Sequence, residues 1–402
     1  MRWFQRAAVA LLVLLAVLGL LAYWQIRTIT HGPLPETRGT LSVAGLRAPV
    51  EVFRDARGVP HLYADNHHDL FFAQGYVQAQ DRWWQMAFYR RICQGRLSEV
   101  AGKSEDAQAL DTLMRTLDLH GAAERDWAAM PDEDKPHYEA FAAGVNAYLE
   151  SRPPRLLALE YSVLGLNGLQ LEIAPYSPVD CLAFGKLMGY TFSGRDLQQE
   201  PRRQRIREVL DDARWNLWNA PFPYDYFPTT IAEEDLPQLA AMRMPAEDTP
   251  EAPVSPAPPA AELTAPPTDA SNAWAVSGAL TESGKPMLAS DPHQGIDMPN
   301  LWYEIGLHSA PDNGEPALNL YGYCAPLLPF VQAGHNDYIA WGLTNVSGSN
   351  ALDLFRIRVN PGNPLQYEWD GAWRDMTVRE EVIEIAGGDD IMLAVRETHL
   401  GP

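Results

Sequence analysis

The spacing of hydrophobic residues changes along the chain and divides it into a helical part followed by a β-rich part. Large apolar side chains recur at helical spacing between Asp69 and Gly102, where we predict one or two helices. The same spacing predicts mostly helix over 111–152, a buried helix over 180–192 and a charged, exposed helix over 196–216. We therefore expect a helical layer built from the first half of the chain.

Strand-like patterns stand on both sides of this helical part. Two short strands are predicted within Thr40–Asp55 and another in the segment GVPHLYA, which begins at Gly58. After Ser271, apolar segments such as NAWAVSGAL, LWYEIGLHS and ALNLYGYC alternate with Gly, Pro, Asn and Asp turns. The pattern predicts a mixed helix and sheet protein in which most strands follow Ser271.

The N-terminus carries an apolar run from Ala7 to Trp24, preceded by Arg2 and Arg6. This run is near the length that crosses a bilayer, and the preceding positive charge is typical of a segment end that stays in the cytoplasm. A removed signal peptide and an uncleaved anchor both fit. The long run and the lack of a clear A-x-A site after it favour the anchor over the signal peptide. A buried core helix at the N-terminus is less favoured than either. Either export signal predicts a protein that is periplasmic, or membrane-anchored with its catalytic domain outside the cytoplasm.

Composition changes sharply over residues 244–270, where Pro, Ala and acidic residues dominate and aromatic residues are missing. Such a segment cannot bury a core, and on composition alone it is a linker between two domains. The net charge of −21 argues against a nucleic-acid partner. The three cysteines, Cys93, Cys181 and Cys324, form no CxxC pair, so a thiolate zinc site is disfavoured.

The sequence lacks several familiar catalytic motifs: it has no GxSxG elbow, no HExxH and no Walker A loop. Serine chemistry of another kind fits the junction at Ser271. A serine hydroxyl needs an adjacent base, and a serine at a chain terminus carries one in its own α-amine, whose pKa is about 7.7–8. This chemistry requires a cut before the serine and a dispensable preceding segment, which the proline-rich stretch would provide.

Three blocks carry a resemblance to the penicillin acylase family of N-terminal-nucleophile hydrolases. The first, GVPHLYADNHHDLFFAQGYVQAQDRWWQMAFYRRICQGRLSEVAG, spans 58–102 and resembles the family's α-subunit. The second, SNAWAVSGALTESGKPMLASDPHQGIDMPNLWYEIGLH, spans 271–308 and resembles the start of the β-subunit. The third, GHNDYIAWGLTNVSGSNALDLF, spans 334–355. The blocks occur in family order, with a spacer where the family places one.

The resemblance implies an α+β fold, an αββα sandwich, formed by a precursor that cuts itself between Ala270 and Ser271. Many members have Gly rather than Ala before the serine. The implied organisation is a signal peptide or anchor over 1–30, an α-subunit region over 31–243, a spacer propeptide over 244–270 and the N-terminal part of a β-subunit over 271–402. The α and β chains would form a heterodimer. Because the chain ends at RETHLGP directly after an apolar run, we expect it to be part of a longer precursor.

The resemblance assigns catalytic roles residue by residue. Ser271 is the expected nucleophile, with its α-amine as base through a bridging water, and His293 is expected to orient the amine and the hydroxyl. The backbone N–H of Val346, or of Asn345 if the alignment slips by one, is the expected oxyanion donor. A second donor, an Asn, is expected beyond residue 402. Without the resemblance, Ser271 is an ordinary strand start and His293 an ordinary loop histidine.

The resemblance also implies substrate and metal contacts. Asn272 is expected to bind or orient the substrate amide, although a strand-edge residue fits nearly as well. Plain core packing is an equally good interpretation of the expected acyl-pocket residues, which are Met188, Phe192, Trp302 and Leu343. No cofactor is needed for catalysis, but many relatives hold a structural calcium ion. Its ligands here would be Glu200, Asn350, the carbonyl of Leu352, and Asp353; family members often have Asp where this chain has Asn350.

Two classes of function compete. The first is a self-processing acylase that hydrolyses the amide of a small molecule such as a β-lactam antibiotic or an acyl-homoserine lactone. The His at position 293, where the penicillin G enzymes have Gln, favours the cephalosporin and acyl-lactone acylases. The second is a non-catalytic, membrane-tethered binding or scaffold protein with a plain linker. A metal-dependent hydrolase has little support, because the sequence shows no catalytic ligand set.

Overall fold

The computed structural model describes residues 2–166, 168–169, 171–193, 196–220, 270–295, 297–345 and 354–402. The helices are α1 (Arg2–His31), α2 (His67–Gln94), α3 (Ser98–Ala101), α4 (Glu105–Leu117), α5 (Leu119–Ala129), α6 (Lys135–Glu150), α7 (Leu159–Leu166), α8 (Pro178–Ser193), α9 (Asp196–Val209) and α10 (Asp212–Trp218). The strands are β1 (Glu51–Arg54), β2 (Pro60–Ala64), β3 (Ala270–Val276), β4 (Met287–His293), β5 (Tyr303–Ser309), β6 (Asn319–Cys324), β7 (Ala333–His335), β8 (Ala340–Trp341), β9 (Val359–Asn360), β10 (Asn363–Trp369), β11 (Ala372–Asp375), β12 (Thr377–Ile383) and β13 (Ile391–Glu397). Single 3₁₀ turns cover Pro154–Leu156 and Gly278–Leu280.

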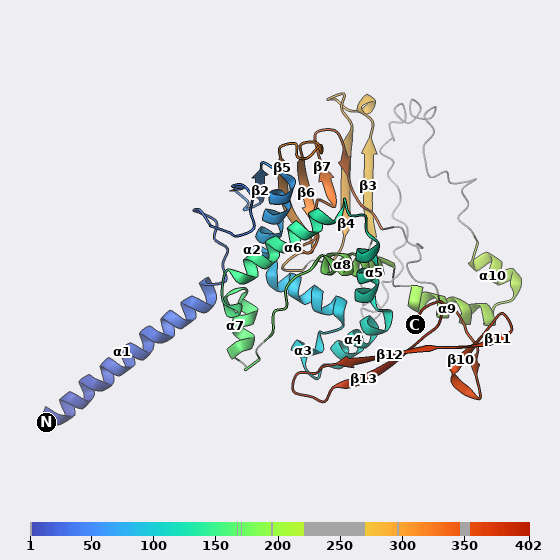
Figure 1. Cartoon of the computed structure of the whole chain (residues 1–402), viewed down its shortest axis with the longest axis horizontal. Coiled ribbons are helices and arrows are strands. Elements are labelled where there is room, and N and C mark those ends of the chain that lie inside the picture. The colour runs from blue at the N-terminus through green and yellow to red at the C-terminus, as the bar shows by residue number, and fades with distance from the viewer. Residues whose placement is uncertain are drawn as a thin grey trace, which may run out of the picture.

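A six-stranded sheet in the order β1-β2-β5-β6-β7-β8 lies beside the helices α2 and α6 (Figure 1). The only parallel pair in this sheet is β2 with β5, so a strand from before the proline-rich segment pairs with one from after it. Three smaller sheets occur in the described residues: the hairpin β3-β4, the set β11-β10-β9 and the pair β12-β13. This arrangement confirms a mixed α+β protein and leaves the αββα sandwich a prediction.

The apolar face of the six-stranded sheet packs on α2. Leu62, Ile305 and Leu307 are fully buried, and they contact Leu70 and Phe71 of the helix in one core cluster. A second, larger cluster joins α2 with α5, α6 and α8. Period-2 alternation along β2 and β5 explains why every second side chain enters the core while the others point to the opposite face.

Helix α2 is set by local sequence signals. The side chain of Asn66 accepts a hydrogen bond from Asp69 N at 2.8 Å, which caps the helix start, and Gly95 ends it in a left-handed conformation with φ of 60°. The helix kinks at Arg82, whose φ and ψ of −138° and 18° are not helical. The kink lies where α2 passes the cavity described below, so it helps to place Asp81 and Arg82.

Two expectations from the sequence require correction. We predicted two strands within Thr40–Asp55, but only Glu51–Arg54 forms a strand, and residues 40–50 form turns and irregular backbone. Strand-like alternation there lacks a neighbouring strand to pair with, because β1 already occupies the sheet edge. The segment LDLFRIRV, over 352–359, also has a strand-like pattern, but β9 begins only at Val359 and residues 354–358 are irregular.

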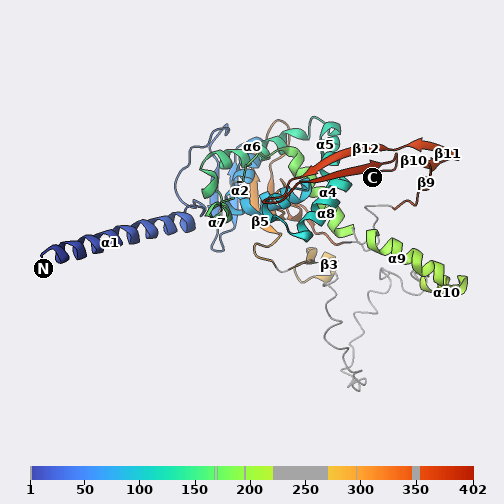
Figure 2. The same ribbon diagram turned by 90° about the horizontal axis from the view of Figure 1, so that it is seen from below.

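Helix α1 extends away from the rest of the molecule (Figures 1 and 2). It is long and apolar enough to cross a membrane, with a mean hydropathy of 2.5 in its most apolar window and none of that window buried. A signal sequence at an N-terminus has the same properties. The helix therefore leaves the choice between signal peptide and anchor as open as the sequence does.

Asp180 fixes the start of α8 against α2. Its buried carboxylate accepts hydrogen bonds from Arg90 Nε at 3.0 Å, Gln94 Nε2 at 3.2 Å and Ser177 N at 2.8 Å. The guanidinium of Arg90 also donates to the carbonyls of Ala174 and Pro175, at 2.8 and 2.7 Å. Because α8 carries Met188 and Phe192, this buried pair determines where both side chains lie.

We expect Asp180→Ala to lower the free energy of unfolding by about 3–5 kcal/mol, because it leaves the Arg90 cation buried without its counterion. Urea denaturation followed by circular dichroism measures this effect. The matched control is Asp126→Ala, which removes the exposed ion pair between Asp126 and Lys186 of α8 and should cost less than about 1 kcal/mol. Equal losses in the two variants would contradict the assigned role of Asp180.

Candidate active site

The expected nucleophile lies in the β3-β4 hairpin. Ser271 is the second residue of β3, is half-buried, and pairs with Pro292 of β4, while Ala270 pairs with His293. Side chains alternate along a strand, so Ser271 and Pro292 share one face of the hairpin, and Asn272, Asp291 and His293 share the other. The strand predicted to follow the proline-rich segment is therefore present. It includes the peptide bond between Ala270 and Ser271.

The Ser271 face of the hairpin borders a cavity. Leu288, Ser290 and Pro292, on that same face of β4, line a cavity of about 800 Å³ between the hairpin and the six-stranded sheet. Gly342 allows this close approach, because a Cβ at that position would lie 2.5 Å from Ser290 Cβ. The hairpin therefore places the Ser271 face next to an open cavity large enough for a small molecule.

Two of the four predicted acyl-pocket residues line this cavity, namely Trp302 and Leu343. Met188 instead packs against the helical core cluster, as the plain-packing interpretation expected. Phe192 does not line the cavity, but its carbonyl accepts a hydrogen bond from Asn345 Nδ2 at 3.0 Å. This bond connects the end of α8 to the segment in which an oxyanion donor is expected.

The floor of the cavity is polar, and the sequence analysis did not single out its residues. Asp81 of α2 accepts two hydrogen bonds from Arg54, both at 2.9 Å, and one from Tyr303 Oη at 2.6 Å. Burial, together with the Asp81 carboxylate, raises the pKa of Tyr303 well above its ordinary value, so the hydroxyl stays protonated and donates. A signal was present in the sequence: the adjacent charged residues Asp81 and Arg82 interrupt the apolar spacing in the middle of the helix.

Arg82 brings a positive charge to the cavity wall. Its Nη1 donates to the carbonyl of Asn300 at 3.2 Å and to Gln85 Oε1 at 3.3 Å, and its guanidinium lies 5.7 Å from the centre of the Tyr303 ring. Burial lowers the pKa of Arg82, but an arginine remains charged at neutral pH. The cavity thus combines apolar walls with a few fixed polar groups, the usual character of a small-molecule site.

His293 lies on the opposite hairpin face from Ser271. Its Nε2 is 2.9 Å from Asp291 Oδ2 and 3.4 Å from Asn272 Nδ2. The structure therefore brings together His293 and Asn272, two predicted site residues, with Asp291 as a third partner that the sequence analysis missed. The contact that we expected between His293 and Ser271 stays a prediction.

The calcium and oxyanion predictions fall largely outside the described residues, since Val346, Asn350, Leu352 and Asp353 lie there. Glu200, from α9, is described, and its Oε2 accepts a hydrogen bond from Leu354 N at 3.3 Å. The carboxylate thus contacts the residue that follows Asp353, and the calcium site stays a prediction. Its oxygen suits a hard cation such as calcium.

The sheet face that helps to line the cavity also carries a histidine pair. His308 Nε2 lies 3.3 Å from His61 Nδ1, and His308 Nδ1 lies 2.7 Å from Asn319 Oδ1. The side-chain amide of Asn319 in turn donates a hydrogen bond to Asp337. The ring of Tyr63 stacks on His308 at 4.4 Å. Burial, followed by the adjacent His61, lowers the pKa of His308 below its ordinary value.

This lowered pKa predicts an acid-sensitive stability. Just below pH 6.5, the folded protein binds fewer protons at His308 than the unfolded protein does. The contribution of neutral His308 to the free energy of unfolding is therefore complete above that pH and falls as the pH drops through the lowered pKa. We expect His308→Gln to flatten the stability profile between about pH 5 and 7. His120→Gln, at a surface ion pair, should leave the slope unchanged. Denaturant midpoints measured across the pH range provide the test, and parallel profiles for wild type and His308→Gln would contradict it.

Comparisons with known proteins place the chain in a family. The profile of the family described as penicillin amidase matches residues 49–402. The acyl-homoserine lactone acylase QuiP of Pseudomonas aeruginosa is 31% identical over 378 residues, which are 92% of this chain and 41% of that protein. Penicillin acylase 2 proenzyme of a Pseudomonas species is 32% identical, over 94% of this chain and 46% of that protein. The chain therefore belongs to the penicillin amidase family.

Two penicillin G acylases are also similar to the chain. Penicillin G acylase of Escherichia coli is 28% identical over 84% of this chain and 44% of that protein. A solved structure, a thermostable penicillin G acylase from Alcaligenes faecalis, is 28% identical and covers 46% of this chain with a TM-score of 0.37. The chain spans less than half the length of the curated relatives that it matches. Family membership is thus shown by sequence, over part of the length of these relatives.

Proposed function

We propose that the protein is a self-processing acylase that hydrolyses the amide bond between an acyl group and an amine. One structural observation carries this proposal: the hairpin face that bears Ser271 borders an open, largely apolar cavity of about 800 Å³. Membership in the penicillin amidase family and the names of the relatives, acyl-homoserine lactone acylase and penicillin acylase, support the same reaction.

The chemistry begins with a cut between Ala270 and Ser271, which turns Ser271 into a chain terminus. The free α-amine then removes the hydroxyl proton through a water molecule, and Oγ attacks the amide carbon of the substrate. The N–H of Val346 or of Asn345 stabilises the oxyanion. Collapse of this intermediate transfers the proton to the departing amine and leaves an acyl ester on Ser271, which water hydrolyses to the acid. No cofactor takes part.

Substrate recognition follows from the cavity. Trp302 and Leu343 provide apolar walls for an acyl group, and Arg82 supplies a cation near the floor. Asn272 and His293 contact each other on the other face of the hairpin, and the family resemblance assigns them the orientation of the substrate amide and of the α-amine. The substrate is a small acyl amide, either an acyl-homoserine lactone or a β-lactam. Relatives of both kinds support this class of substrate, the lactone acylase at 31% identity and the penicillin acylase at 32%.

The remaining features belong to the same proposal. The segments 31–243 and 271–402 correspond to α and β chains that stay associated as an αββα heterodimer, and residues 244–270 are the discarded spacer. Helix α1, over the segment 1–30, exports the catalytic region as a signal peptide or an anchor. Glu200, with Asn350, the carbonyl of Leu352 and Asp353, holds a structural calcium ion between α9 and the segment that precedes Leu354.

The test is to express the full-length precursor and determine the N-terminus of every resulting chain by mass spectrometry. We expect a new chain that begins Ser-Asn-Ala-Trp, and release of free amine from at least one member of a panel of acyl-homoserine lactones and β-lactams. A folded, uncut chain that hydrolyses no member of the panel would instead favour the non-catalytic scaffold.

A further inference from the structure

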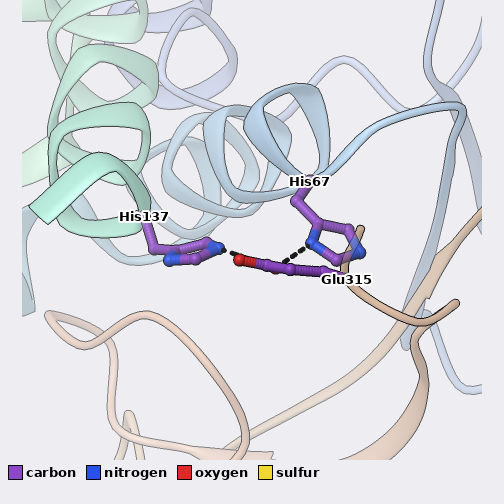
Figure 3. A group of neighbouring side chains, drawn as sticks. All are labelled: His67, His137 and Glu315. Carbon is purple, nitrogen blue, oxygen red and sulfur yellow. Dashed lines mark hydrogen bonds and ion pairs between the residues drawn. The ribbon is translucent and has the colours of Figure 1, made fainter. Parts of the chain in front are cut away.

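Three potential metal ligands from three separate elements meet at one edge of the helical layer (Figure 3). His67 is the first residue of α2, His137 is the third residue of α6, and Glu315 lies in the turn between β5 and β6. Glu315 Oε2 lies 2.6 Å from His67 Nδ1 and 3.6 Å from His137 Nε2. One ligand atom from each residue lies within 4.8 Å of the other two.

The kinds of donor indicate which ion would fit. Two imidazoles and one carboxylate are a common zinc ligand set, with a fourth position taken by water, whereas calcium and magnesium prefer oxygen ligands alone. Zinc bonds of about 2.0–2.2 Å in a tetrahedral site separate the ligand atoms by about 3.4 Å. The 2.6 and 3.6 Å distances lie on either side of this value. The half-exposed Glu315 can make the adjustment by rotating its side chain.

The surrounding structure holds both imidazoles in place. The ring of His67 is buried, and its backbone N–H donates to Asp312 Oδ2 at 3.1 Å, which ties the β5-β6 turn to the start of α2. The ring of His137 packs edge-on against Phe71 at 4.9 Å and lies 5.9 Å from Phe330. Rings that are already positioned lose little freedom when they bind an ion.

We propose that His67, His137 and Glu315 form a binding site for a divalent transition metal, with zinc as the ion whose ligand preference matches best. The site is separate from the Ser271 cavity, since none of its residues lines that cavity. It has a further consequence that rests on the proposed function. His67 and His137 precede the proposed cut and Glu315 follows it, so a bound ion would link the α chain to the β chain.

The binding test uses the full-length protein without an affinity tag, carrying Ser271→Ala so that cleavage plays no part. After treatment with EDTA and desalting, zinc chloride is titrated by calorimetry, and bound zinc is counted by elemental analysis. We expect one tight equivalent in this background. His67→Gln and His137→Gln should each weaken binding by more than about tenfold, since losing a ligand costs more than losing an outer-shell partner.

His120→Gln is the matched control, because His120 also faces a glutamate, with its Nδ1 3.6 Å from Glu124 Oε1, but belongs to no cluster of three potential ligands among the described residues. It should bind zinc like the parent protein. Glu315→Gln, at an exposed side chain, covers the case in which a buried histidine variant misfolds, and it should also lower the affinity. Unchanged zinc binding in folded His67→Gln and Glu315→Gln, or no tight equivalent in the parent, would overturn the proposal.

A second measurement addresses the link between chains. In the cleaved wild-type protein, kept in excess calcium, the zinc chelator 1,10-phenanthroline should lower the concentration of urea at which the two chains separate on size exclusion, and zinc should restore it. The shift should be missing in Glu315→Gln. If the precursor is never cut but still binds zinc through these residues, the metal site stands and only the proposed processing fails.

Discussion

Ser271→Ala is expected to leave the precursor as a single chain and to lower amide hydrolysis by at least about 10⁴-fold, the scale seen when a serine nucleophile is removed. The change deletes the hydroxyl that attacks both the Ala270–Ser271 bond and the substrate. The fold should survive, because Ser271 is a half-buried residue whose backbone pairs with β4 whatever its side chain. Mass spectrometry of the chains and amine release from acyl-homoserine lactones measure the two losses separately.

Two variants sharpen this test. Ser277→Ala removes a hydroxyl from the same hairpin, one that accepts a hydrogen bond from Ala279 N at 3.3 Å, and it should be cut and active like wild type. Ser271→Cys keeps a nucleophile at the same position and should still be cut, although more slowly. Processing at the same bond in Ser271→Ala, or hydrolysis at the level of Ser277→Ala, would refute the proposed nucleophile.

Gly144→Ala is expected to destabilise the fold by about 3 kcal/mol or more, because two helix backbones meet at this residue. A Cβ at Gly144 would lie 1.8 Å from the carbonyl oxygen of Phe72, and one at Gly75 would lie 2.1 Å from the carbonyl oxygen of Phe141. Neither contact can be relieved by turning a side chain, so α2 and α6 would have to move apart. Gly75→Ala should therefore give a similar loss in urea denaturation.

Gly185→Ala in α8 is the control. Its Cβ would meet no atom within 4 Å, so the change should raise stability by about 0.5–1 kcal/mol through helix propensity. The double variant Gly75→Ala/Gly144→Ala should lose less than the sum of the single losses, since the first substitution already separates the helices. A loss below about 1 kcal/mol in Gly144→Ala would mean that the crossing is not tightly packed.

The regular part of this fold could be predicted from spacing alone. The helix at 180–192 and the strand at 58–64 appear close to their predicted bounds, as α8 and β2. Their apolar residues carry a clear period, and the burial of each face follows from it. The predicted strands within Thr40–Asp55 were only partly right, because pairing depends on a neighbour that the local sequence does not specify.

The candidate site was less predictable, for a geometric reason. The resemblance selected Trp302 and Leu343, which share the cavity wall, but the same reasoning selected Met188, which packs in the helical core. Helical and strand spacing predict on which face of its element a residue lies, but they do not predict which other element packs against that face. The contact between His67 and Glu315 could not be predicted for the same reason, because it depends on the parallel pairing of β2 with β5.

The β3-β4 register has a consequence for the order of events after a cut before Ser271. Strand β3 starts at Ala270, so cleavage would free only the first rung of the ladder, and the residues from Ser271 to Val276 would keep their partners from Pro292 to Met287. The new terminus would then be created already anchored, instead of having to find its place from a loose end. The orientational entropy of the nucleophile and its base is in that case lost during folding of the precursor, before any substrate arrives.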